Sequence, residues 1–150
     1  MKIGMVCYST AQGLGYLAKN FYDAGIVQEV MVFRHPHGNR PSYMEWYPEG
    51  TIELRARPFS GLAVENFLAK IDICLFFETP FCWDFVRRCY KRKVKTAIIP
   101  MYEWFLQNPP LKFDKFINPS LLDQDYFPQG EFIPIPAPQG TWKLRTKAER

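Results

Sequence analysis

Two glutamates and a glycine turn are the residues of this chain whose types and positions could do chemistry. Glu78 and Glu103 each follow closely after an apolar run, and Gly13-Leu14-Gly15 follows the first apolar run of the chain. A carboxylate can act as a general base or bind the hydroxyl groups of a polyol. Glycines let backbone N–H groups approach a phosphate without a side chain in the way. This chemistry requires the fold to bring the three segments together.

The glycine turn lies between a predicted strand and a predicted helix. Residues 2–8 form a short apolar run typical of a strand buried on both faces. The helix predicted over 16–25 has Leu17 and Phe21 on one apolar face and Gly25 as a natural end. The turn lacks the third glycine of a dinucleotide fingerprint and the Lys-Ser or Lys-Thr of a P-loop. A tight turn with no ligand is therefore an equally weighted alternative.

The rest of the chain alternates between strand and helix patterns. Strands are predicted over 28–33, 51–56, 72–77, 94–100 and 115–118, helices over 61–70 and 80–93, and one or two helical turns over 119–127. The run 72–77 is the most apolar and reads as the central strand, 51–56 as a half-exposed edge strand, and 131–138 as an extended segment. We expect Leu62 to face inward with the other apolar residues of its helix. The pattern predicts an α/β fold, with a Rossmann-like open, mostly parallel sheet and helices on both faces.

Ligands of such sheets bind outside the carboxyl ends of the strands. The glycine turn, the pair Glu78-Thr79, and the segment Tyr102-Glu103-Trp104 should all reach that edge. Phe81 and the aromatic members of the last segment could stack on a sugar ring. Either glutamate taken alone could equally be a helix cap or a salt-bridge carboxylate, and their convergence is what favours a site.

Three stretches of this sequence are similar to the N-terminal domain of the GT-B glycosyltransferases, glycosyl transferase group 1 or family 4-like. They are the opening strand with its glycine turn and helix, the run 98–104, and the segments 114–120 and 132–136. In that family two Rossmann-like domains face each other across a cleft, and the N-terminal one mainly holds the acceptor. The resemblance implies a hexosyltransferase-like enzyme, with 1–138 as the acceptor-side domain, 139–150 as the start of the interdomain linker, and the second, donor-binding domain absent.

The resemblance also implies roles for individual residues. Gly13, Leu14 and Gly15 would approach the donor phosphates or sugar, and Glu78 and Glu103 would be the catalytic carboxylates. Thr79, Tyr102 and Trp104 would lie on the acceptor side. Glu78 stands where many retaining members carry a histidine. No metal or cofactor is expected beyond the nucleotide-sugar co-substrate, and this chain alone is expected to be inactive.

Composition narrows the class of protein. A length of 150 residues, with 23% charged residues, suits one domain. A net charge of +4 is by itself no reason to expect binding of nucleic acid. It has no apolar run of about eighteen residues and no signal region, and its four cysteines are scattered, so we expect a cytoplasmic protein. Cys7 and Cys74 are expected to be buried thiols, and Cys82 and Cys89 to share a helix face.

Other interpretations remain open at this point. The first is a stand-alone Rossmann-like module that binds a nucleotide or a protein without catalysis. The basic stretch 87–95 is best explained as a solvated helix face, while contact with RNA, phosphate or an acidic membrane surface is the minority interpretation. His35 and His37 flank a proline and could bind a metal, but exposed loop histidines are favoured. The aromatic region 42–50 could line a ligand cleft or pack on the sheet edge.

Overall fold

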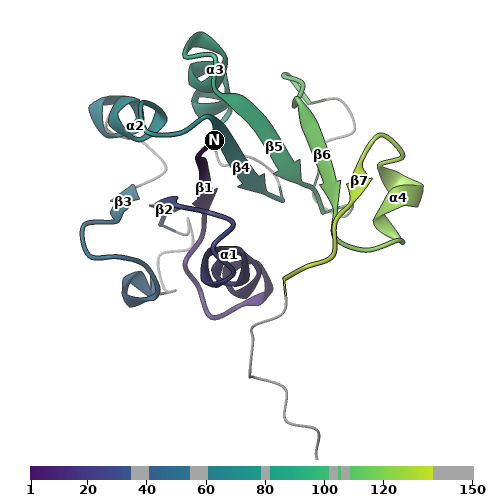
Figure 1. Cartoon of the computed structure of the whole chain (residues 1–150), viewed down its shortest axis with the longest axis horizontal. Helices are drawn as coiled ribbons and strands as arrows, with labels where there is room; N and C mark the ends of the chain where they lie inside the picture. Colours follow the sequence, from purple (N-terminus) through teal and green to yellow (C-terminus); the bar gives the residue numbers. More distant parts are fainter. Residues whose placement is uncertain (35–40, 55–60, 79–81, 102–104, 106–108, 137–150) are drawn as a thin grey trace, which may run out of the picture.

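Seven parallel strands form a single open sheet in the computed structural model of this chain (Figure 1). The structure describes residues 1–34, 41–54, 61–78, 82–101, 105 and 109–136. The strands are β1 (Ile3–Cys7), β2 (Glu29–Phe33), β3 (Ile52–Leu54), β4 (Ile73–Phe77), β5 (Lys95–Ile99), β6 (Lys115–Asn118) and β7 (Glu131–Phe132). Their spatial order is β3-β2-β1-β4-β5-β6-β7, so the predicted α/β fold with a Rossmann-like parallel sheet is confirmed.

Helices cover both faces of the sheet. They are α1 (Gly13–Asp23), α2 (Gly61–Leu68), α3 (Trp83–Lys91) and the short α4 (Asp123–Tyr126), and a 3-10 turn, η1 (Met44–Trp46), precedes β3. Ala18 and Phe21 of α1 pack on one face of the sheet, against alternate residues of the central strands. Phe67 of α2 and Phe85 of α3 pack on the other face. Because both faces of the sheet are covered, β1 and β4 are apolar along nearly their whole length, and β5 is apolar from Ala97 to Ile99.

Strand β4 is the middle strand, as its composition predicted, and β3 is an edge strand. The register pairs Val6 of β1 with Phe76 of β4, and Phe77 of β4 with Ile99 of β5. The carboxyl ends of these three strands therefore lie level at one edge. That edge is where the predicted site residues were expected.

Some local details differ from the sequence-based expectations. Leu62 is 72% exposed, because it lies on the outer side of α2 while Val64 and Phe67 fill the inner side. In the described residues α3 begins at Trp83, and Cys82 is its N-cap with an extended backbone, so Cys82 and Cys89 do not share a helix. Glu131 and Phe132 form a strand that pairs with β6, where only an extended segment was predicted.

Cys7, Cys74 and Cys89 are buried free thiols. Within the described part of the chain, no helix has both the length and the apolar character needed to cross a bilayer. The domain boundary predicted at residue 138 lies outside the described residues.

Candidate functional site

The candidate site lies at the carboxyl edge, where the strand order reverses. From β1 the chain proceeds outward to β2 and β3, then returns to add β4 on the other side of β1. Ligands of open parallel sheets bind at such a reversal, because the loops that follow the two strands diverge there. Tyr8 and Glu78 each stand two residues beyond the paired Val6 and Phe76, so they lie level across this boundary.

The turn that follows β1 is tightly folded. Ser9 and Thr10 are buried, and the N–H of Gln12 donates to the carbonyl of Thr10 at 2.7 Å. Gly15 is buried against the same carbonyl, since a Cβ placed on Gly15 would lie 1.8 Å from Thr10 O. The missing side chain of Gly15 is thus required by the packing of α1 on the turn.

Gly13 has the opposite environment. It is exposed, and a Cβ added to it would meet no atom within 4 Å. Leu14 packs its side chain against the core, so only its backbone faces the edge. No side-chain hydrogen bond caps α1, and its first turn carries no acidic residue. Because the N-terminus of a helix carries unsatisfied N–H groups and partial positive charge, this arrangement suits an anionic ligand.

Glu78 is held in an unusual backbone conformation directly after β4. Its φ is 61°, in the left-handed region that costs most residues about 1–2 kcal/mol. Its N–H donates to the carbonyl of Ile99 at 2.7 Å, which fixes the peptide to β5. Strained residues of this kind cluster at active sites and ligand clamps.

Tyr8 shares the environment of Glu78. Its side chain is half-buried, and its pKa is raised to about 12, first by burial and then by the negative charge of Glu78. The hydroxyl of Tyr8 therefore stays protonated at neutral pH and remains a hydrogen-bond donor. Sequence reasoning missed Tyr8, although its place at the end of β1 was a usable signal.

Several predicted site residues cannot be placed. Thr79, Tyr102, Glu103 and Trp104 lie outside the described residues, as do His35 and His37. Gly13, Leu14 and Gly15, predicted as a turn, form the start of α1, which follows β1, and Glu78 follows the neighbouring strand β4. The role of the second predicted carboxylate stays an expectation. Within the described part of the chain, no group of three or more His, Cys, Asp or Glu residues is arranged to hold a metal ion.

The aromatic region 42–50 packs in part against the sheet core, and its role in lining a ligand cleft stays a prediction. Tyr47 is buried, contacts Cys7 Sγ through its hydroxyl at 3.6 Å, and packs edge-on against Tyr22 of α1. Trp46 is only half-buried, and its ring lies 5.2 Å from that of Tyr16 in the first turn of α1. Sequence reasoning missed Tyr16, because its partner is distant in sequence.

Part of the basic stretch 87–95 pairs with carboxylates. Arg88 pairs with Asp84 at 3.0 Å and with Glu65 at 3.0 Å, and Arg92 also pairs with Glu65. Hydrogen bonds from these arginines lower the pKa of Glu65. These pairs join α2 to α3, which favours the interpretation of this stretch as a solvated, structural face.

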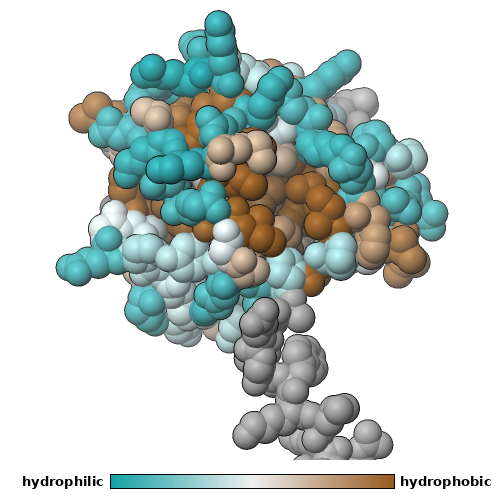
Figure 2. All heavy atoms as spheres, in the orientation of Figure 1, coloured by the Kyte–Doolittle hydropathy of each residue, from teal (hydrophilic) through white to brown (hydrophobic). Residues whose placement is uncertain are grey.

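An apolar groove lies away from the candidate site. Its volume is about 690 Å³, and its walls include Leu75, Ala97 and Ile117 on the sheet face that α1 covers only in part. The first residues of five strands line it, namely Ile3, Ile73, Lys95, Lys115 and Glu131, so it lies toward the amino ends of the strands. Figure 2 shows these hydrophobic residues gathered in the centre of the view, between α1 and β6. Its position at the amino ends argues against a catalytic role.

Comparisons with protein-family models, with curated proteins and with solved structures find no match for this chain. Function must therefore be argued from the site.

Proposed function

We propose that this chain is the acceptor-side domain of a glycosyltransferase, which moves a sugar from a nucleotide-diphosphate donor to a hydroxyl acceptor. The observation that carries the proposal is that helix α1, whose N-terminus has no side-chain cap, follows β1, and that the strained Glu78 follows the neighbouring strand β4 at the same edge of the sheet. The first group suits a diphosphate and the second suits a hydroxyl. The resemblance to GT-B enzymes supports the same assignment.

The N-terminus of α1 would serve the departing diphosphate. As the bond between the anomeric carbon and the diphosphate oxygen breaks, negative charge builds on that oxygen. Fixed N–H groups stabilise such charge without reorganising during the reaction. The exposed backbone at Gly13 gives them access to the ligand.

Glu78 would serve the acceptor. Its carboxylate would take the proton of the acceptor hydroxyl while the oxygen bonds to the anomeric carbon, and the electron pair of the broken bond leaves with the diphosphate. Tyr8, which is protonated at neutral pH, would donate a hydrogen bond near the same reacting groups. The proposed role of Glu103 as the second carboxylate stays a prediction.

Charge substitution at Gly13 tests the donor site. Gly13→Asp adds a negative charge at the first helical position, which favours the helix dipole but repels a diphosphate. In calorimetric titrations of the full-length gene product with UDP- and GDP-sugars, we expect at least one donor to bind. Gly13→Asp should weaken that binding at least tenfold, whereas Gly13→Ala, the matched uncharged variant, should weaken it much less.

Substitution of Glu78 tests the reaction. Release of nucleoside diphosphate by the full-length gene product, with a panel of acceptors, should fall at least a hundredfold in Glu78→Gln, while donor binding stays within twofold. Glu53→Gln, an exposed glutamate on the edge strand β3, is the control. Full activity in Glu78→Gln would rule out the proposed base. Donor binding without any transfer by the wild-type protein would favour a binding module instead.

A further inference from the structure

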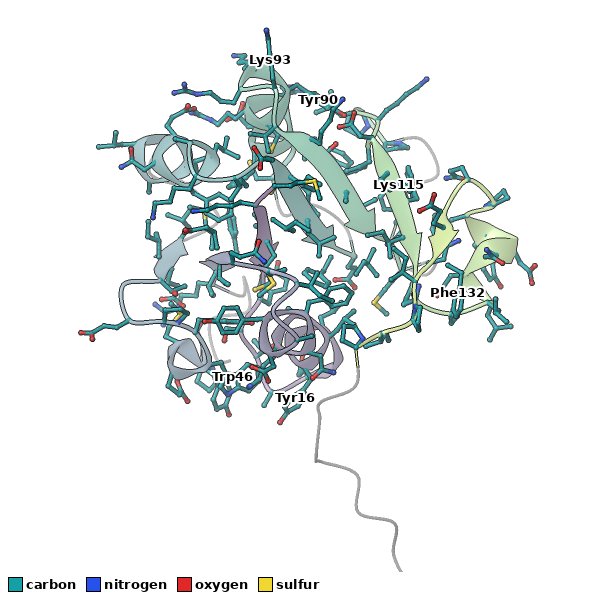
Figure 3. All side chains as sticks on the ribbon, in the orientation of Figure 1. Tyr16, Trp46, Tyr90, Lys93, Lys115 and Phe132 are labelled. Atoms are coloured by element: carbon teal, nitrogen blue, oxygen red, sulfur yellow. The ribbon has the colours of Figure 1, made fainter. Side chains whose placement is uncertain are left out.

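Three aromatic side chains form a surface cluster beside the candidate site. They are Tyr16 in the first turn of α1, Trp46 in η1, and Tyr43 directly before η1. The Trp46 ring lies 5.2 Å from Tyr16, with 31° between the ring planes, and 5.0 Å from Tyr43, with 18° between them. Figure 3 shows Tyr16 and Trp46 side by side below α1, on the opposite side of the view from the labelled Tyr90 and Lys93. We call Tyr16, Tyr43 and Trp46 the aromatic surface.

The aromatic surface is held rigidly to the end of β1. The Ser9 hydroxyl donates to the carbonyl of Tyr43 at 2.6 Å, and the N–H of Tyr43 donates to the carbonyl of Ser9 at 2.9 Å. Tyr47, one residue after η1, is buried in the sheet core. A ring fixed before binding loses little conformational freedom when a ligand arrives, so it contributes more to affinity.

The aromatic surface also adjoins the open space at the helix N-terminus. Gly13 and Tyr16 are three residues apart in α1, so they share one side of the helix. Side chains of a helix lean toward its N-terminus, which brings the Tyr16 ring toward Gly13. Tyr16 remains 50% exposed even though it contacts Trp46. A ligand at Gly13 would therefore have aromatic surface beside it.

The charges near the aromatic surface favour an uncharged ligand. Glu45 lies within η1 and Glu49 lies shortly after it, and both are exposed. Two carboxylates would repel the phosphates of a nucleotide but can accept hydrogen bonds from hydroxyl groups. Aromatic rings with polar neighbours suit a ligand that has one apolar face and many hydroxyls, which is the chemistry of a pyranose sugar.

We propose that the exposed part of the Tyr16 ring, supported from behind by Trp46, forms a carbohydrate-stacking surface, which seats the neutral sugar acceptor of the reaction. The assignment of this sugar as acceptor rests on the proposed function. Sugar binding itself does not depend on it, because it requires only the aromatic surface.

The test measures binding of neutral oligosaccharides to the intact protein without a donor. The probes are maltotetraose, cellotetraose and chitotetraose, followed by saturation-transfer NMR and by tryptophan fluorescence. We expect at least one of them to bind, with transfer strongest to its ring C–H protons. Tyr16→Ala and Trp46→Ala should each weaken this binding at least tenfold, and Tyr16→Phe should retain it. Phe132→Ala, which removes a ring 44% exposed at the other end of the sheet, should leave it unchanged.

The outcomes separate this inference from the proposed function. If no probe binds, or if Tyr16→Ala and Trp46→Ala bind like the wild-type protein with unchanged circular dichroism, the stacking surface is wrong. If uridine alone displaces the bound sugar, the aromatic surface binds a nucleobase, and this result would also overturn the carbohydrate-stacking surface. Donor binding that remains sensitive to Gly13→Asp would leave the proposed function standing in each case. Sugar binding without any donor binding would support the stacking surface and count against the transfer reaction.

Discussion

Gly13 and Gly15 stand two positions apart in the first turn of α1, yet their surroundings differ. Gly15 is pressed against the Thr10 carbonyl, whereas the position of a Cβ on Gly13 is open. The sequence presents the two as one glycine motif. The structure gives Gly15 a packing role and leaves Gly13 as the residue that keeps the helix N-terminus accessible.

Alanine substitution should therefore separate the two glycines. Gly15→Ala forces a methyl group into a backbone carbonyl and should destabilise the protein by about 1–3 kcal/mol. Gly13→Ala adds a better helix former in open space and should raise stability by a few tenths to about 1 kcal/mol. Urea denaturation of both variants measures this. Equal destabilisation by both would mean that the open space at Gly13 is filled in solution.

The strain at Glu78 predicts a conflict between stability and function. Glu78→Gly puts a glycine, which adopts a positive φ without strain, at this left-handed position. The variant should be more stable by about 1 kcal/mol, and its transfer activity should be lost. Glu78→Ala keeps the strain, so it should lose activity without gaining stability. Thermal unfolding of the two variants gives the comparison. A loss of stability in Glu78→Gly would show that the Glu78 side chain contributes to the fold.

Helices α1 and α3 end with the same pair of backbone hydrogen bonds but with different residues. In α1 the N–H of Gly25 donates to the carbonyl of Tyr22, and the N–H of Ile26 donates to the carbonyl of Phe21. Gly25 has a φ of 70°. In α3 the residue equivalent to Gly25 is Lys93, at φ 58°. The N–H of Lys93 donates to the carbonyl of Tyr90, and the N–H of Val94 donates to the carbonyl of Cys89. This end motif favours glycine, so α3 ends with a lysine in a conformation that costs free energy.

Substitutions at Lys93 and at Gly25 should change the stability of the protein in opposite directions. Lys93→Gly should stabilise the protein by about 1 kcal/mol, and Gly25→Ala should destabilise it by about the same amount. Differential scanning calorimetry would detect both as shifts of the melting temperature. Lys91→Gly, in the last turn of the same helix, is the control and should destabilise. A destabilised Lys93→Gly would mean that the lysine side chain outweighs the strain.

Asp114 joins the loop before β6 to the start of β5. Its carboxylate accepts hydrogen bonds from the N–H of Thr96 at 2.9 Å and from the Thr96 hydroxyl at 3.0 Å. Burial acts to raise the pKa of Asp114, but these bonds and the nearby Lys95 outweigh it, so the pKa is lowered. The stabilisation is thus fully present above the unfolded pKa of about 4 and is lost as the pH falls through the folded pKa.

The pH dependence of Asp114→Asn tests this pairing. At pH 7 the variant should be less stable by about 1 kcal/mol, a value reduced by the partial exposure of the carboxylate. Near pH 3 the difference from the wild-type protein should begin to shrink, because the pH is then below the unfolded pKa and the unfolded wild-type chain gains a proton at this carboxylate. Urea denaturation at both pH values, with the exposed Asp125→Asn as control, measures it. A difference that grows as the pH falls would have the wrong sign.

Most of the strands and helices were predictable because their signals are local in the sequence. Apolar runs gave β1, β4 and β5, and periodicity with Gly25 gave α1. The features that could not be predicted from the sequence depend on contacts between distant segments. Whether Leu62 points toward the core or toward solvent is decided by which side of α2 packs on the sheet. The pairing of Tyr16 with Trp46 is decided by how η1 folds back on α1.

Across the whole molecule, the strand order separates two surfaces of different character. The carboxyl edge carries the uncapped helix, Glu78 and the aromatic surface, while the apolar groove lies toward the amino ends. The edge follows from the alternating pattern of strands and helices and was predictable. The groove was not, because it depends on how much of the sheet α1 leaves uncovered.

The groove predicts that the native protein binds an apolar fluorescent dye. A volume of about 690 Å³ with apolar walls should accept anilinonaphthalene sulfonate without unfolding. Ile117→Thr keeps a β-branched residue in β6 but removes apolar surface from the groove, so it should lower dye fluorescence several-fold. Leu62→Gln, which removes an exposed leucine from α2 outside the groove, should leave the fluorescence unchanged. Equal fluorescence from the wild-type and Ile117→Thr proteins, with unchanged circular dichroism, would mean that the dye binds elsewhere and that the groove is closed in solution.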